Sequence, residues 1–352
     1  MIATRRITDL FDIESAIVLG PFGGLSSIEL TAAVSTLGGL GSYGLYGYDA
    51  ERIAETAAAL RAETGRPFAL NLWAPTGDEV AALPEGSEAA FTAVAALFAE
   101  LGMDLPSPPP RLLPDFSAQV AAVIDARPAA ASFVFGLPDR GVVDRLHRAG
   151  IRVVGTATTV AEAVACEAGG ADAIVATGFE AGGHRVSFLA PAERSLVGTM
   201  SLVPQVVDAV SVPVIAAGGI ADRRGVAAAL ALGASGVQVG TAFLRTRASA
   251  ASAAHRAAIA RATAESTVLT RAMSGRLARG HPNRAVRTIE SAGAILPFPA
   301  QNWLTGQFRA EARKRDLGDL ESLWMGQSAG LSASMDASEV FRELTRGLPR
   351  TG

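Results

Sequence analysis

Short apolar runs and longer amphipathic segments alternate along most of the chain. Each run is apolar at nearly every position rather than at every second one, which is typical of strands covered on both faces of a parallel sheet. Eight such runs predict eight strands, at Ala16–Leu19, Gly39–Ser42, Phe68–Leu72, Ser132–Phe135, Arg152–Gly155, Ala173–Ala176, Val214–Ala216 and Gly236–Val239. Eight alternating units of strand and helix favour closure of the sheet into a (β/α)8 barrel, the TIM barrel.

The segments between these runs predict alanine-rich amphipathic helices. The clearest are Asp49–Thr64, Asp139–Ala149, Thr159–Ala168 and Asp222–Leu232. The side chains of Thr159 and Asp222 can each accept a hydrogen bond from a backbone N–H of the first helical turn, so both are expected N-caps. Gly169 and Gly233 are expected to end their helices, because glycine tolerates the backbone conformation in which many helices end.

Two stretches are too long and irregular to be simple connections within a barrel. Trp73–Ser117 contains the proline run Ser107–Pro110, which is compatible with neither a helix nor a central strand. We expect this insertion to lie as a lid over the mouth of the barrel. Arg245–Leu320 begins with a stretch rich in alanine and arginine that reads as helix, and a closing helix is expected near Ala337–Gly347.

These patterns divide the chain into three expected parts. They are a barrel domain over 1–244 with the lid insertion 73–117, a small, mainly helical subdomain on the substrate side over 245–320, and a closing segment over 321–352 that packs on the barrel. The length of 352 residues suffices for a barrel of about 250 residues and roughly 100 more.

Composition and charge argue against several classes of function. The net charge of −3 indicates no electrostatic attraction to nucleic acid or to an anionic membrane. No run of about 18 apolar residues predicts a membrane-spanning helix, and Met1–Asp12 lacks the apolar core of a secretory signal. Cys166 is the only cysteine, which rules out an internal disulfide and suggests a small core side chain. We expect a soluble cytoplasmic protein, with a homodimer left open.

Lys314 is the only lysine, and it lies in a stretch typical of a solvated helix face. No predicted barrel strand ends in lysine. Schiff-base aldolases and enzymes with covalently bound pyridoxal phosphate both need a buried lysine amine. The sequence therefore argues against both classes.

The predicted strand Ala173–Ala176 runs into a glycine-rich loop that carries Glu180 and His184. Titratable groups at the carboxyl end of a barrel strand are typical of an active site. Because Gly182 and Gly183 leave the backbone unobstructed, the imidazole of His184 can point into the mouth of the barrel and accept a proton from a weak carbon acid. Glu180 is expected to orient the loop or to bind backbone N–H groups, with a catalytic role as the alternative.

Two further strands end in glycines, at Gly218-Gly219 and at Gly240-Thr241. Loops after the last two strands of such barrels commonly bind phosphate, because glycine lets backbone N–H groups approach an anion closely. We therefore predict a phosphate-bearing ligand here, with the hydroxyl of Thr241 as a further donor. Tight turns without a ligand are the alternative.

Aromatic side chains near other strand ends are candidates for the walls of a pocket. Gly20–Ser26 is expected to be a flexible loop, with Phe22 as a wall beside a flat ring. Tyr43, Tyr46 and Tyr48 are expected either to line the pocket or to pack at its rim.

The other three histidines lie outside any glycine loop. His147, His255 and His281 are in polar or helical contexts and are expected to be exposed. The four histidines do not cluster at metal-ligand spacing, so we expect no bound metal.

Five motifs, spread over nearly the whole chain, resemble those of the nitronate monooxygenases, also called 2-nitropropane dioxygenases, which are FMN-dependent TIM barrels. The first four are Phe68–Leu72, Glu180–Arg185, Ala216–Ile220 and Gln238–Thr241, and a C-terminal signature is matched by Leu269–Arg279 and Leu323–Gly330. Each motif alone is modest, but five in order are specific for the superfamily.

The resemblance implies that His184 is the catalytic residue, which removes the α-proton of a nitroalkane or steadies a nitronate that is already ionised. Oxidation with O2 would leave a carbonyl compound and nitrite, with the flavin carrying the redox step. The residues expected to contact FMN are Gly20, Phe22, Gly23, Asn71, Thr177, Gly182, Gly183, Gly218, Gly219, Gln238, Gly240 and Thr241.

The chain departs from the family pattern at four positions. Leu19, Phe22 and Thr177 stand where a glutamine, a methionine and a second glutamine are common, and Val186 replaces a glycine. Related FMN enzymes have similar loops, so NAD(P)H-dependent reduction of an enoyl thioester or a quinone is a second expected function. A non-redox barrel that binds a sugar phosphate and a non-catalytic flavin-binding protein are further alternatives.

Overall fold

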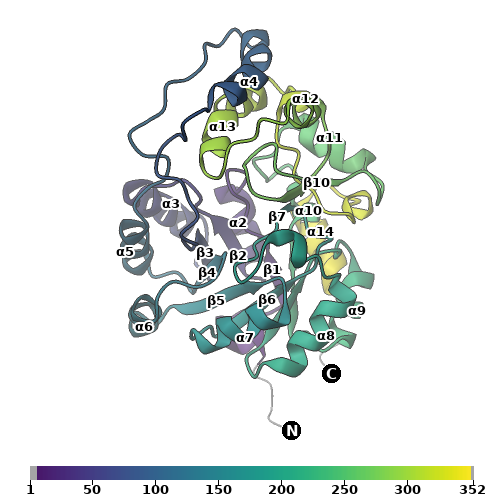
Figure 1. Cartoon of the computed structure of the whole chain (residues 1–352). Coiled ribbons are helices and arrows are strands. Elements are labelled where there is room, and N and C mark those ends of the chain that lie inside the picture. The colour runs from purple at the N-terminus through teal and green to yellow at the C-terminus, as the bar shows by residue number, and fades with distance from the viewer. Residues whose placement is uncertain (1–5, 350–352) are drawn as a thin grey trace.

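Eight parallel strands form a closed barrel in the computed structural model, which describes residues 6–349 (Figure 1). The strands are β1 (Ile17–Leu19), β2 (Gly41–Gly44), β3 (Phe68–Trp73), β4 (Ala130–Val134), β5 (Arg152–Ala157), β6 (Ala173–Thr177), β8 (Val214–Ala217) and β9 (Gly236–Val239). They pair in the order β1-β9-β8-β6-β5-β4-β3-β2. Leu40 closes the ring, because its N–H donates to Ile17 O at 2.9 Å and its carbonyl accepts from Leu19 N at 2.9 Å. The predicted TIM barrel is confirmed, with every strand end within two residues of its predicted place.

A ring of helices covers the outside of the barrel. It consists of α2 (Ile28–Thr36), α3 (Ala50–Glu63), α5 (Phe116–Ala126), α6 (Arg140–Arg148), α7 (Val160–Ala168), α8 (Thr199–Ala209), α9 (Arg223–Ala231) and the closing helix α14 (Ala337–Thr345). Thr159 and Asp222 cap α7 and α9, accepting hydrogen bonds from Glu162 N and Arg224 N. Phe341 of α14 packs into the core between the barrel and its helices.

The amino end of the barrel is plugged by a short helix that the sequence pattern did not predict, α1 (Ile7–Phe11). Ile7, Leu10 and Phe11 are buried in one cluster with side chains from the inside of the barrel. A Cβ atom on Gly236, the first residue of β9, would clash with Ile7 Cδ1. Water is therefore kept out at this end, and the opposite end carries the open loops.

A second, helical lobe lies over the loop end of the barrel (Figure 1). It contains α4 (Glu88–Glu100), α11 (Ala253–Arg261), α12 (Arg284–Ala292) and α13 (Ala300–Lys314). Helix α4 comes from the insertion, yet it shares a hydrophobic core with α12 and α13, and the rings of Phe98 and Phe308 meet at 5.6 Å. The domain boundaries remain predictions, but the insertion packs as part of this lobe.

A small antiparallel sheet joins the lobe to the barrel. Its strands are β10 (Val268–Thr270), β11 (Ala278–Gly280) and β7 (Gly183–His184), and Ala278 pairs with His184. The remaining short elements are α10 (Thr241–Leu244) and three 3-10 turns at Ala192–Arg194, Gly318–Leu320 and Ala329–Leu331. The glycine loop after β6 is thus held by a hairpin from almost 100 residues further along the chain.

Across residues 6–349, none of the helices combines the length and the apolar character that crossing a bilayer requires.

Candidate active site

A cavity of about 370 Å³ opens at the carboxyl ends of the barrel strands, beneath the helical lobe. We call it the main cavity. Its volume lies within the range of cofactor and substrate pockets. All thirteen residues predicted for the site line it, namely Gly20, Phe22, Gly23, Asn71, Thr177, Gly182, Gly183, His184, Gly218, Gly219, Gln238, Gly240 and Thr241. The barrel therefore brings residues from the ends of five strands, β1, β3, β6, β8 and β9, to one place.

The glycine turns leave one end of the main cavity walled by backbone. Gly218 and Gly219 have φ angles of +94° and +74°, which residues with a side chain rarely adopt. A Cβ atom on Gly20 would lie 3.1 Å from the Cα of Gly240. Thr241 Oγ1 accepts a hydrogen bond from Gly326 N at 3.0 Å, so its own proton is available to a ligand. This end has the open backbone expected of a phosphate site.

His184 stands at the cavity wall between two indole rings. Its ring centre is 4.8 Å from Trp73 and 5.6 Å from Trp324. Burial, with the positive charges of Arg276 and Arg309, lowers the pKa of His184 to about 3. The imidazole is therefore neutral at physiological pH.

Ser274 determines how that neutral imidazole is protonated. His184 Nε2 lies 2.8 Å from Ser274 Oγ. The same hydroxyl lies 3.1 Å from the carbonyl oxygen of Arg276, to which it can donate its only proton. The hydroxyl oxygen then accepts the hydrogen of Nε2, and Nδ1 keeps the lone pair.

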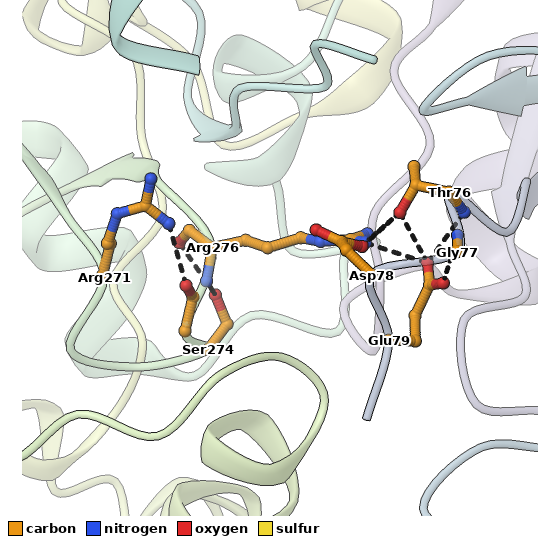
Figure 2. A network of polar contacts seen from close by, with 8 residues as sticks. Thr76, Gly77, Asp78, Glu79, Arg271, Ser274 and Arg276 are labelled. Atoms are coloured by element: carbon orange, nitrogen blue, oxygen red, sulfur yellow. Dashed lines mark hydrogen bonds and ion pairs between the residues drawn. The ribbon is translucent and has the colours of Figure 1, made fainter. Parts of the chain in front are cut away.

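Arg276 ties the hairpin that carries Ser274 to the insertion (Figure 2). Its Nη2 donates to Asp78 Oδ1 at 2.5 Å and to Glu79 Oε1 at 2.9 Å. Its guanidinium also lies over the rings of Phe135 and Phe298, 4.3 and 4.1 Å from their centres. These contacts of Arg276 hold in position the hairpin that places Ser274 next to His184.

The carboxylate of Glu180 binds a backbone N–H group, which is one of the roles expected for it. Its carboxylate accepts from Thr199 N at 3.0 Å and from Thr199 Oγ1 at 2.9 Å, at the start of α8. Arg185, which sequence reasoning did not single out, is fully buried and donates to the carbonyl oxygens of Thr177, Gly178 and Ser195. Together the hydrogen bonds of these two charged side chains hold the glycine loop after β6 in place.

Two arginines that sequence reasoning missed, Arg309 and Arg313, are the only charged side chains that line the main cavity in the described part of the chain. Both come from one face of α13, together with Asn302 and Gly306. Arg309 bonds Ser322 and Asn302, and Arg313 bonds the carbonyl of Gly24, so within residues 6–349 neither is paired with a carboxylate. Their spacing predicts a shared helix face, but only the packing of α13 over the barrel turns that face toward the cavity.

Both arginines keep unused hydrogen-bonding capacity. The Nε atoms of Arg309 and Arg313 are buried and have no partner among the described residues. Burial and the charge of Arg313 lower the pKa of Arg309 to about 10, which leaves it protonated at neutral pH. The main cavity is consequently positive and suited to an anion.

The expected exposure of His255 was wrong. Its side chain is fully buried and Nε2 donates to the carbonyl oxygen of Trp324 at 2.9 Å, because α11 packs this face against the 323–329 segment. His147 is partly exposed and pairs with Asp172 at 2.9 Å. His281 is half-buried, with Nδ1 3.2 Å from Ser266 O.

The remaining expected residues divide between cavity and core. Tyr46 lines the main cavity, whereas the hydroxyls of Tyr43 and Tyr48 bond each other at 3.1 Å in the core. Cys166 is buried in α7, as expected. Of the four departures from the family pattern, Leu19 packs in the core, whereas Phe22, Thr177 and Val186 line the main cavity.

No group of three or more histidine, cysteine or acidic side chains is arranged to bind a metal ion within the described residues.

The Gly20–Ser26 loop is held in place by hydrogen bonds, because Ser26 Oγ accepts from both Phe22 N and Gly44 N.

The closed barrel, with a positively charged cavity at the carboxyl ends of its strands, defines a protein of the α/β barrel class whose pocket is suited to an anion. Comparison with known proteins agrees. A family model described as nitronate monooxygenase matches residues 4–347. The chain belongs to the nitronate monooxygenase family, a family of flavin-dependent oxidoreductases.

Curated relatives and solved structures resemble the chain over nearly its full length. A probable nitronate monooxygenase of Staphylococcus aureus is 38% identical over 344 residues, which are 97% of this chain and 96% of the relative. The structure of nitroalkane oxidase from Streptomyces ansochromogenes is 37% identical, with a TM-score of 0.86, and the match covers 97% of this chain and 96% of that one. FabK from Thermotoga maritima is 28% identical, with a TM-score of 0.74 and coverage of 98% and 96%.

Proposed function

We propose that this protein binds FMN in the main cavity and oxidises nitronates, the ionised forms of nitroalkanes, to a carbonyl compound and nitrite with O2. Membership of the nitronate monooxygenase family and the likeness to a nitroalkane oxidase support the reaction class. The electrostatics of the cavity support the ionised substrate.

The residues present fit FMN. Gly218, Gly219, Gly240 and Thr241 leave an open backbone and a free hydroxyl proton for its phosphate. Asn71 and Gln238 supply amide side chains along the cavity wall. FMN, when bound, supplies the transfer of electrons from substrate to oxygen.

The observation that carries the choice of substrate is a neutral histidine beside an unpaired positive wall. Accepting a proton from a neutral nitroalkane would place a cation at His184, near Arg276 and Arg309, whose charges already lower its pKa. Binding of an anionic nitronate is favoured instead, because Arg309 and Arg313 attract its charge and it can accept hydrogen bonds from them. His184 would position the nitronate and hold a proton once the anion raises its pKa.

The second candidate is an FMN-dependent reductase that takes hydride from NAD(P)H and reduces an enoyl thioester or a quinone. Arg309 and Arg313 could pair with the phosphates of NAD(P)H. This gives the reductase weaker support than the nitronate reaction has.

An anaerobic spectroscopic experiment separates these functions. The purified protein should show the absorption of a flavin, and propane-2-nitronate should bleach it rapidly, whereas neutral 2-nitropropane and NADPH should bleach it slowly or not at all. Bleaching by NADPH alone would support the reductase, and a protein that neither contains nor binds FMN would exclude both functions.

A further inference from the structure

A second cavity, of about 150 Å³, lies beside the main one, between the ends of β2 and β3 and the insertion. We call it the side pocket. Tyr46 and Trp73 line both cavities. The rest of its lining consists of Leu45, Gly47, Leu72, Ala74, Pro75, Glu79, Leu113, Pro114, Phe116, Gln119, Arg276 and Phe298.

Only a layer of aromatic rings separates the side pocket from His184. Trp73 packs on Tyr46 at 4.4 Å and on Phe298 at 5.5 Å between ring centres. The same indole meets the imidazole of His184 at 4.8 Å. A substrate held at His184 therefore lies one aromatic ring away from the side pocket, because Trp73 lines both cavities.

The walls of the side pocket are mostly apolar and would favour a hydrocarbon group. Leucine, proline and aromatic side chains dominate the lining. Of the polar side chains, Gln119 is already used, because its Nε2 donates to Tyr48 O at 2.7 Å. Arg276 is different, since the residue is 7% exposed and its buried Nη1 has no partner in the described residues.

The charge around Arg276 determines what Nη1 can accept. Asp78 and Glu79 both bond Nη2, and hydrogen bonds and the charge of Arg276 hold their pKa values below the usual range. One guanidinium thus faces two carboxylates, and the local charge is negative. A third anion would be repelled here, whereas a neutral carbonyl or ether oxygen would satisfy the free N–H without repulsion.

We propose that the side pocket binds the hydrocarbon tail of the substrate, so that the enzyme prefers nitronates with a chain of about six carbons and tolerates a neutral oxygen within that chain. This rests on the proposed function. An apolar cavity of about 150 Å³ is large enough to hold a benzene ring, which sets the size of the tail. The charged nitronate stays at the arginines of α13, and the neutral tail passes Trp73.

The test is the chain-length dependence of kcat/KM for straight primary nitronates of three to eight carbons. In the wild-type holoenzyme, kcat/KM should rise by a factor of about 4 for each methylene that enters the side pocket, and then level off. Leu113→Trp fills the side pocket and should flatten this rise while leaving propane nitronate unaffected. Leu105→Trp, at a 43% exposed leucine of the same insertion, is the matched control and should behave as the wild type.

Three outcomes distinguish this proposal from the proposed function. A flat chain-length series in the wild type, with propane nitronate turned over, overturns the side pocket and leaves the function standing. A series that rises equally in Leu113→Trp overturns it as well, since the tail then lies elsewhere. If no nitronate is turned over, hexanamide decides, because it should raise the Tm of the wild-type and Leu105→Trp holoproteins but not of Leu113→Trp, and equal shifts in all three would overturn the site.

Discussion

His184 Nε2 and Ser274 Oγ lie 2.8 Å apart, although ninety residues of sequence separate them. Pairing of β7 with β11 places the histidine beside the hairpin, and the turn before β11 points the serine hydroxyl at its ring. Ser274 is itself 1% exposed, so no water competes for this bond. The site is thus completed by a contact between the barrel and the helical lobe.

Removing the Ser274 hydroxyl should impair catalysis more than substrate binding. In Ser274→Ala the two neutral forms of His184 become closer in energy, since a hydrogen bond of about 1 kcal/mol is lost. We expect kcat to fall roughly 5-fold with little change in KM, and 15N NMR of the ring to show a mixture of tautomers. Ser332→Ala removes a buried hydroxyl that has no hydrogen-bond partner within residues 6–349 and serves as the control. Equal kinetics in both variants would contradict the role of Ser274.

Arg309→Met should weaken the binding of the anionic substrate. Hydrogen bonds to charged groups contribute about 1.5–3 kcal/mol, so kcat/KM for a nitronate should fall roughly 10- to 100-fold, mainly through KM. The pKa of His184 should rise at the same time, because one of the charges that lowers it is gone. Arg315→Met removes an exposed arginine of the same helix end and should leave both quantities unchanged.

Gly218→Ala should disrupt the glycine-walled end of the main cavity. At φ +94° an alanine is strained, and its Cβ would lie 3.0 Å from the carbonyl oxygen of Gly178. We expect a free energy of unfolding lower by about 1–3 kcal/mol and loss of bound flavin. Gly141→Ala, in α6 with open space around it, should instead raise stability by about 0.5–1 kcal/mol. Thermal denaturation and flavin content measure both variants.

Stability should fall in mild acid because of His255. Burial lowers its pKa to about 4, below its value in the unfolded chain. Between about pH 6.5 and pH 4 the unfolded state therefore binds one more proton than the native state, and on the order of 3 kcal/mol is lost as the pH falls through this window. His184, with a pKa lowered to about 3, acts in the same direction.

The comparison of His255→Leu with the wild type checks this. The slope of unfolding free energy against pH should be smaller in the variant between pH 4 and 6.5, whatever its stability at pH 7. Parallel curves would show that another group is responsible.

The pattern of apolar residues and glycines along the chain was enough to predict the barrel and most of its mouth. Strands buried on both faces are apolar throughout, and turns that need a positive φ require glycine, as at Gly218 and Gly219. Both features can be recognised in the sequence alone. These features are local, so the pattern of neighbouring residues suffices to place them, and all thirteen predicted residues meet in one cavity.

The charged and polar side chains around that cavity could not be predicted, because the packing of distant segments places them there. Ser274, Arg276, Arg309 and Arg313 lie in a region whose pattern indicates helix and loop, and nothing nearby in sequence says which side chain faces His184. The same holds for His255, which looks like a surface residue until α11 packs on the 323–329 segment. The charge of a cavity and the protonation of its histidine depend on distances across the fold, because electrostatic and hydrogen-bond energies are set by separation in space rather than along the chain.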